Sequence, residues 1–258
     1  TLDDKGEPKP KLALSWEHSE DFKTWTIKLR PGVKFHDGTP FNAQAVKENF
    51  DRQKDPANKC RCAFYITSIK SVDVIDDLTV RYNFSDPAVN FPETQSIQSS
   101  NNVMQSPTAW KAKGDDYNRN PVGTGPFKFD SWDRGNGEVT IVKNEDYWGE
   151  QAKLDEIIFR TISDGNTRRQ ELQAGSIDAY DFVAPADYET LEGDGAKILV
   201  RDPFNILYLG INGGNVPDSG ANPALQNPLV RQALAHAIDR DTIVSSLLPD
   251  GAEAAIQF

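Results

Sequence analysis

Residues 121–126, with the sequence Pro-Val-Gly-Thr-Gly-Pro, constrain the backbone more than any other stretch of this chain. Proline fixes one backbone dihedral angle and glycine frees it, so we expect the chain to make a fixed crossing here. Residues 85–120 before it are rich in Pro, Asn and Ser, whereas short apolar runs and helical patterns alternate after it. We therefore predict that a strand at residues 24–29 and a strand at residues 206–211 belong to different subdomains.

The part before this crossing has the pattern of a sheet with one long helix. Asn42 is predicted to cap a helix that ends by Asp55, because Val46 and Phe50 lie four residues apart on one face. Alternating and β-rich runs predict the strands, which lie at residues 24–29, 72–75 and 79–84, and a short helix is expected around residues 108–113.

The part after the crossing alternates predicted strands and helices. A helix is expected to begin at Asn166 or Thr167 and to end at Gly175, and a long amphipathic helix is expected from Pro228 to about Leu248. The run at residues 157–159 is continuously apolar, which favours a buried central strand. Further strands are predicted at residues 127–132, 139–143, 177–182, 198–201 and 206–211.

Charge and hydropathy exclude two classes of protein. The formal net charge is −11, and phosphate binding needs clustered Lys and Arg, so we expect no nucleic-acid partner. No apolar run approaches the roughly 20 residues that a membrane-spanning helix requires.

The sequence shows no catalytic or cofactor motif. It has no nucleophile elbow, phosphate-binding loop, zinc helix or dinucleotide fingerprint, so we expect no enzyme activity and no cofactor. His18, His36 and His236 are far apart in sequence, which argues against a metal site. We predict that His36 makes a loop hydrogen bond that fixes the turn around Asp37 and Gly38.

The cysteines and aromatic residues leave alternatives open. Cys60 and Cys62 are compatible with a local disulfide, with free thiols, or with a minor metal role. Phe64, Tyr65 and Trp110 lie in polar loop surroundings, where a binding platform and a structural role are equally reasonable. The other four tryptophans fall in or beside predicted strands and are expected in the core; they are Trp16, Trp25, Trp132 and Trp148.

Several segments together resemble one family. They are residues 12–16 (LALSW), 25–38 (WTIKLRPGVKFHDG), 120–127 (NPVGTGPF), 144–149 (NEDYWG), 172–178 (LQAGSID) and 230–239 (VRQALAHAID). In this order they resemble the solute-binding proteins of ABC importers for peptides, nickel complexes and related solutes. The chain departs from the family pattern at Gln44, where an acidic residue is usual, and at the loop with Cys60 and Cys62.

The resemblance implies an α/β fold of the periplasmic-binding-protein-like II type, in which two lobes of mixed sheets and helices close around a solute. Family members continue well beyond the segment at residues 230–239, so we expect a truncated version that lacks most of the second lobe. The implied organisation is an extra subdomain of lobe I at residues 11–132, an α/β subdomain of lobe I at 133–213, and the start of lobe II at 214–258.

The function implied by the resemblance is capture of an oligopeptide-like solute outside the cytoplasmic membrane and delivery to the ABC permease subunits. The implied location is the periplasm, or a lipid anchor on the outer face of that membrane. A solute-sensing domain and, less favoured, a hydrolase with an interdomain cleft are the alternatives. The expected ligand contacts are Phe64, Tyr65, Asn102, Met104, Asn205 and Tyr208.

Two further expectations follow from an incomplete second lobe. A cleft built from two lobes loses contacts when one is missing, so this chain alone should bind its solute far more weakly than the native protein. The helix at residues 228–248 would keep an apolar face, which should lie against the first lobe or another copy unless the helix is poorly ordered.

Overall fold

We describe the protein from a computed structural model, which defines residues 1–3, 5–60, 66–96, 103–200, 207–213, 220, 222–248 and 251–255. The chain divides into two compact units, Thr1–Thr161 and Ile162–Phe258. Strand β2 belongs to the first unit and residues 207–211 belong to the second, so the predicted separation of these two segments is confirmed.

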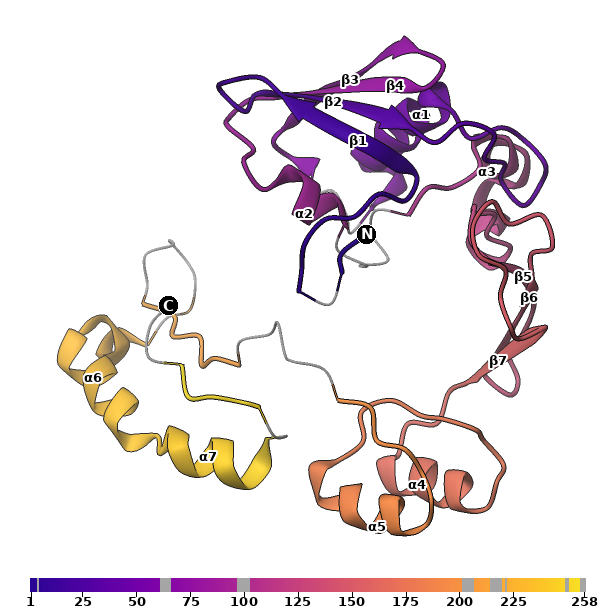
Figure 1. Ribbon diagram of the computed structural model, residues 1–258. Helices are drawn as coiled ribbons and strands as arrows, with labels where there is room; N and C mark the ends of the chain where they lie inside the picture. The colour runs from indigo at the N-terminus through magenta and orange to yellow at the C-terminus, as the bar shows by residue number, and fades with distance from the viewer. Residues whose placement is uncertain are drawn as a thin grey trace. The chain divides into compact units, whose positions relative to one another are not determined.

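The first unit begins with a four-stranded antiparallel sheet (Figure 1). Its spatial order is β1-β2-β4-β3, and the strands are β1 (Ala13–His18), β2 (Thr24–Leu29), β3 (Ile69–Asp76) and β4 (Thr79–Phe84). The strands expected at residues 72–75 and 79–84 are confirmed, and β3 and β4 pair as a hairpin across the turn at Asp77 and Leu78. The sequence analysis did not predict β1.

The register of this sheet places its apolar side chains on one face. Trp25 pairs with Tyr82 and Ile27 pairs with Val80, and successive residues of a strand point to opposite faces. The intervening positions, Thr26, Lys28 and Arg81, form a polar face. The apolar face and the helix that packs on it form the main hydrophobic core.

Helix α1 (Ala43–Lys54) supplies the other half of that core. Asn42 caps it as predicted, because its side-chain oxygen accepts a hydrogen bond from the Ala45 N–H at 3.0 Å. Val46 and Phe50 are buried on one face of the helix, which contacts β3 and β4. Short helices follow in the chain: η1 (Pro56–Asn58), α2 (Phe91–Ser96), α3 (Pro107–Lys113) and η3 (Gly114–Arg119).

A three-stranded antiparallel sheet completes the first unit, with the order β5-β6-β7. Its strands are β5 (Phe127–Asp133), β6 (Glu138–Lys143) and β7 (Glu156–Arg160). The expected boundary between residues 132 and 133 falls inside the β5–β6 hairpin, so this sheet continues across it. The expected division into three subdomains remains a prediction.

The prediction of a buried central strand at residues 157–159 is wrong. Strand β7 lies at the edge of its sheet, and the side chains of Ile158 and Phe159 are 53% and 57% exposed. An apolar run shows that a strand has two apolar faces, but neighbouring elements decide whether those faces are covered.

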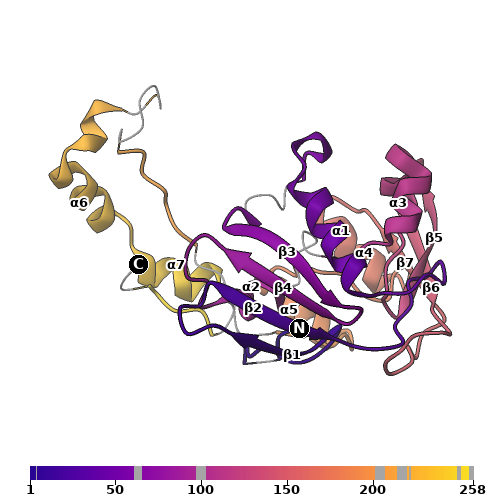
Figure 2. The same cartoon turned by 90° about the horizontal axis from the view of Figure 1, so that it is seen from above.

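The second unit consists of helices in its described residues (Figure 2). Helix α4 begins one residue before the predicted start, and Asp164 caps it rather than Asn166 or Thr167. Residues 177–182, 198–200 and 207–211 form no strand, contrary to prediction. These segments have the side chains of strands, but they do not belong to either of the two sheets that the described residues form, and β-propensity depends on such a context. The helices are α4 (Gly165–Gln173), η4 (Pro185–Asp187), α5 (Tyr188–Gly193), η5 (Pro223–Gln226), α6 (Pro228–Ala237) and α7 (Arg240–Leu247).

The long helix predicted at residues 228–248 is two helices. Ile238 adopts an extended conformation, and Asp239 then caps α7 by accepting a hydrogen bond from the Thr242 N–H at 3.0 Å. An Asp side chain that bonds a backbone N–H three residues later starts a new helix rather than continuing the old one. Leu229, on the predicted apolar face, is 70% exposed. None of the described helices is long and apolar enough to cross a membrane.

Candidate functional site

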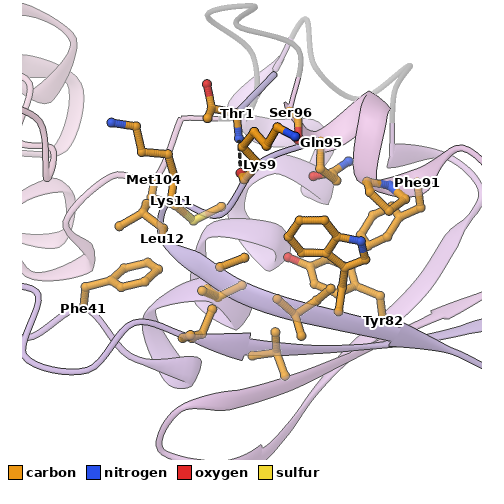
Figure 3. Close-up of a pocket in the computed structure, with 17 residues that line it drawn as sticks. Thr1, Lys9, Lys11, Leu12, Phe41, Tyr82, Phe91, Gln95, Ser96 and Met104 are labelled. Atoms are coloured by element: carbon orange, nitrogen blue, oxygen red, sulfur yellow. Dashed lines mark hydrogen bonds between the residues drawn. The ribbon is translucent and has the colours of Figure 1, made fainter. Parts of the chain in front are cut away.

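A pocket of about 230 Å³ lies on the apolar face of the four-stranded sheet, entirely within the first unit. Figure 3 shows Leu12, Phe41 and Met104 at one end of this pocket and Tyr82 and Phe91 at the other. Strands β1, β2 and β4 form its floor, and α1 and α2 contribute to its walls. The lining residues are Thr1, Lys9, Lys11, Leu12, Ala13, Trp16, Ile27, Leu29, Phe41, Val46, Val80, Tyr82, Phe91, Pro92, Gln95, Ser96 and Met104.

Tyr82 places one polar atom in this apolar lining. Its side chain is 8% exposed and lines the pocket. Burial raises the pKa of Tyr82 far above its ordinary value, so the hydroxyl stays protonated. A protonated phenol in the wall of a pocket can donate a hydrogen bond to a ligand.

The two lysines at the rim of the pocket already have partners. The Lys9 ammonium forms an ion pair with Asp3 at 3.1 Å. The Lys11 ammonium lies 5.8 Å from the centroid of the Trp148 ring. Between these lysines the lining is mainly apolar, which is suited to a neutral group.

Asn49 fixes the segment that carries Met104. Its side-chain amide donates to the Ala45 and Gln105 carbonyl oxygens, both at 2.8 Å, and its oxygen accepts from the Gln105 N–H at 2.9 Å. Asn49 is 2% exposed, so these bonds are shielded from water. Arg52 adds a hydrogen bond to the Gln105 side chain and stacks on Trp110 and Tyr117.

The structure places two of the six expected ligand contacts. Met104 lines the pocket, and its contact with a ligand stays a prediction. Tyr208 lies in the second unit and is 69% exposed. The other four, Phe64, Tyr65, Asn102 and Asn205, lie outside the described residues.

Sequence reasoning missed most of the pocket. Trp16, Tyr82 and Phe91 line it, although the sequence analysis places Trp16 in the core and assigns no site role to Tyr82 or Phe91. The signal for Tyr82 was its alternation with Val80 in the predicted strand, which puts both side chains on one face. No signal marked Phe91, because α2 was not predicted.

Side chains from η3 and from residues 144–149 hold the crossing at residues 121–126. Tyr117 donates from its hydroxyl to the Val122 carbonyl at 2.9 Å and accepts from the Val122 N–H at 3.1 Å. The Trp148 indole donates to the Thr124 carbonyl at 3.0 Å, and the Asn144 amide donates to the Gly125 carbonyl at 3.0 Å. The predicted fixed crossing is thus held by residues of the NEDYWG motif.

His36 bonds this crossing rather than its own turn, which corrects the prediction. Its Nδ1 accepts a hydrogen bond from the Gly123 N–H at 3.3 Å, so Nε2 carries the proton and donates to the Gly125 carbonyl at 3.0 Å. Asp37 fixes the turn instead, because its carboxylate accepts from the Thr39 N–H at 3.0 Å. The imidazole ring of His36 extends beyond its own turn and reaches Gly123 and Gly125 in the crossing.

Stability is expected to depend on pH through His36. Burial, reinforced by Lys128, lowers the pKa of His36 below its ordinary value, although the Gly125 carbonyl and Asp37 oppose that shift. The unfolded chain then binds more protons than the folded chain, so we expect the free energy of unfolding to fall as the pH drops below about 6.5. Urea titrations between pH 7 and pH 5 measure this slope, which should be smaller in His36→Gln. An equal slope in both proteins would contradict the assignment.

The alternative of a hydrolase has no support in the described residues. The Ser106 hydroxyl donates to the Asp37 carboxylate and accepts from the Ala109 N–H at 3.1 Å, so it caps α3. His36 faces the crossing, which leaves Ser106 without the adjacent base that a nucleophile needs. Within the described ranges, no group of three or more His, Cys, Asp and Glu residues could hold a metal ion.

The structure decides among the three alternatives for the cysteines. Cys60 is disulfide-bonded. The chain has one other cysteine, Cys62, which lies outside the described residues.

Comparison with known proteins gives consistent results. Residues 7–258 match the model described as "Bacterial extracellular solute-binding proteins, family 5 Middle". The glutathione-binding protein GsiB of Pectobacterium atrosepticum is 37% identical over 239 residues, which are 90% of this chain and 44% of GsiB. The chain therefore spans about half the length of the curated relatives that it matches.

Two solved structures are similar over nearly the whole chain. One is the periplasmic binding protein DppA of Helicobacter pylori in complex with the peptide STSA, with a TM-score of 0.72, 28% identity, and coverage of 93% of this chain and 49% of DppA. The other is NikZ of Campylobacter jejuni in complex with Ni(L-His), with a TM-score of 0.73, 27% identity, and coverage of 95% and 48%. These matches confirm the resemblance and the fold class inferred from the sequence, and the chain belongs to the bacterial extracellular solute-binding proteins, family 5.

Proposed function

We propose that this chain is part of the solute-binding component of an ABC importer, which captures an oligopeptide-like solute outside the cytoplasmic membrane and delivers it to the permease. The observation that carries this proposal is the family match over residues 7–258. Proteins of this family act outside the cytoplasm as transport components, and we place this protein in the periplasm or on a lipid anchor.

The choice of a peptide rests on the relatives and on the pocket. GsiB is named for glutathione, itself a tripeptide, and DppA was solved with the peptide STSA. A mostly apolar pocket with one available hydroxyl is suited to recognising a side chain of a peptide. The complex of NikZ with Ni(L-His) makes a nickel chelate the competing solute class.

Calorimetry on the protein that carries this chain separates the two solute classes. The solutes are glutathione, the peptide Ser-Thr-Ser-Ala, trialanine and a nickel–histidine complex. We expect at least one peptide to bind with a Kd in the micromolar range or below, about −8 kcal/mol, and the nickel complex to bind no more than weakly. Binding of the nickel complex alone would overturn the peptide assignment.

A transport assay separates delivery from sensing. We expect cells that lack the gene to lose uptake of the bound peptide, whereas a sensing role would leave uptake intact when the transporter genes are expressed from a constitutive promoter. Intact uptake would overturn the proposal of a transport component.

The expected ligand contacts Phe64, Tyr65, Asn102, Met104, Asn205 and Tyr208 remain part of this proposal. Tyr208 offers a clean test, because its ring is 69% exposed and Leu207, its neighbour, is 81% exposed. If Tyr208 contacts the solute, Tyr208→Ala should weaken peptide binding about tenfold, because aromatic contacts often contribute more than 1 kcal/mol. The matched variant Leu207→Ala should bind as the parent does; equal affinity in both variants would remove Tyr208 from the site.

A further inference from the structure

We infer that the pocket over the four-stranded sheet is a subsite for one apolar, preferably aromatic, side chain of the bound peptide. This inference rests on the proposed function and specifies which peptides the site prefers.

The size and lining of the pocket determine the class of group that it takes. Its volume of about 230 Å³ is large enough for the side chain of Leu, Met or Phe. Its walls are mainly aliphatic and aromatic, through Leu12, Trp16, Val46, Phe91 and Met104. A charged side chain would lose its hydration among these apolar walls, which favours a neutral group.

The hydroxyl of Tyr82 is a second, independent observation that points to a ligand. This side chain is more than nine-tenths buried and lines the pocket. A ligand atom that bonds its phenol adds a hydrogen bond to the apolar contacts with the walls. A tyrosine side chain of the bound peptide could place its ring against the apolar walls and form a hydrogen bond with the hydroxyl of Tyr82.

Neighbouring side chains hold the walls of the pocket in place. Phe91 contacts Trp25, Tyr82 and Phe84 with ring centroids 5.8, 4.9 and 5.0 Å apart. Asn49 holds the backbone of Gln105, next to Met104. The walls are therefore positioned before a ligand arrives, which reduces the entropy lost on binding.

Peptide affinities test the inference in the protein that carries this chain. Burying a phenylalanine ring contributes a factor of about 10 to 100 in affinity. We expect at least one of the tripeptides with a single Phe among alanines to bind more tightly than trialanine and glutathione by about that factor. Replacing this Phe with Tyr should preserve or improve binding in the parent, and Tyr82→Phe should remove any gain from the phenol.

A variant that fills the pocket provides the control for binding elsewhere. Ala13 lines the pocket, whereas its neighbour Leu14 does not. Ala13→Leu should abolish the preference for Phe while trialanine still binds, and Leu14→Phe should leave the preference intact. Thermal melts confirm that both variants fold; if Ala13→Leu does not, Leu12→Phe replaces it.

Direct observation of the pocket does not depend on transport. Met104 is the single methionine of the chain, so labelling methionine methyl groups gives one signal from the pocket, assigned with Met104→Leu. N-acetylphenylalanine amide should shift this signal, because an aromatic ring would lie against the methyl group. N-acetylalanine amide should not shift it.

The outcomes separate the two proposals. Peptide binding without a preference for Phe, together with no shift of the Met104 signal, would overturn the subsite and leave the proposed function standing. A shift of the signal without binding of any peptide would overturn the proposed function and support the pocket as an apolar site.

Discussion

Replacing Phe91 with Ala is expected to lower the free energy of unfolding by about 3 to 5 kcal/mol, the range for removal of a buried aromatic side chain. Phe91 is 3% exposed and is in ring contact with Trp25, Tyr82 and Phe84. Its removal leaves a cavity between α2 and the sheet, which that packed sheet cannot close. Urea titration, followed by tryptophan fluorescence and circular dichroism, measures the loss.

The same substitution at Phe159 is the matched control. Phe159 is 57% exposed on β7, so Phe159→Ala should change the free energy of unfolding by about 0.5 kcal/mol or less. If both variants lose a similar free energy of unfolding, the aromatic cluster around Phe91 is not part of the stabilising core.

Asn49→Asp is expected to destabilise the protein by about 3 to 5 kcal/mol at pH 7, the cost of an unpaired buried charge. The substitution hardly changes the shape of the side chain. It replaces the amide that donates to the Ala45 and Gln105 carbonyl oxygens with an oxygen that faces both of them. Because Gln105 follows Met104, this variant should also loosen the pocket and weaken peptide binding.

The pH dependence of Asn49→Asp distinguishes charge from shape. Burial and two facing carbonyl oxygens should raise the pKa of the new carboxyl in the folded state above its unfolded value of about 3.9. The folded variant then binds more protons than the unfolded chain, so its stability relative to the parent should recover as the pH falls toward 4. Asn118→Asp, at an exposed position, is the control and should show little loss at pH 7. A loss in Asn49→Asp that does not change with pH would point to packing instead of charge.

The motifs that identify the family and the residues that form the pocket are largely different. His36, Asn144 and Trp148 belong to the recognisable segments, and all three bond the crossing at residues 121–126. They hold the segment that leads into strand β5. Tyr82, Phe91 and Met104, which line the pocket, lie outside those segments. Family membership therefore identifies the scaffold, and the pocket residues carry the inference about the solute.

The sequence by itself determined the elements whose signals are local. Asn42 and Val46 sufficed for helix α1, and the alternation at residues 24–29 sufficed for strand β2, because caps and side-chain periods are properties of neighbouring residues. The dense prolines and glycines at residues 121–126 likewise indicated a fixed crossing. The family was recognisable because its short motifs, which reflect such local requirements, occur in the family's order along the chain.

Only the tertiary structure decided the features that depend on residues distant in sequence. The exposure of Phe159, the partners of His36 and the joining of Trp16, Tyr82 and Phe91 around one pocket each depend on which segments meet in space. Residues 177–182 have strand-forming side chains but join neither sheet of the described part of the chain, and Asp239 divides a continuous apolar pattern into α6 and α7. Burial and pairing are set by contacts across the fold, and one side-chain pattern is compatible with several such sets of contacts.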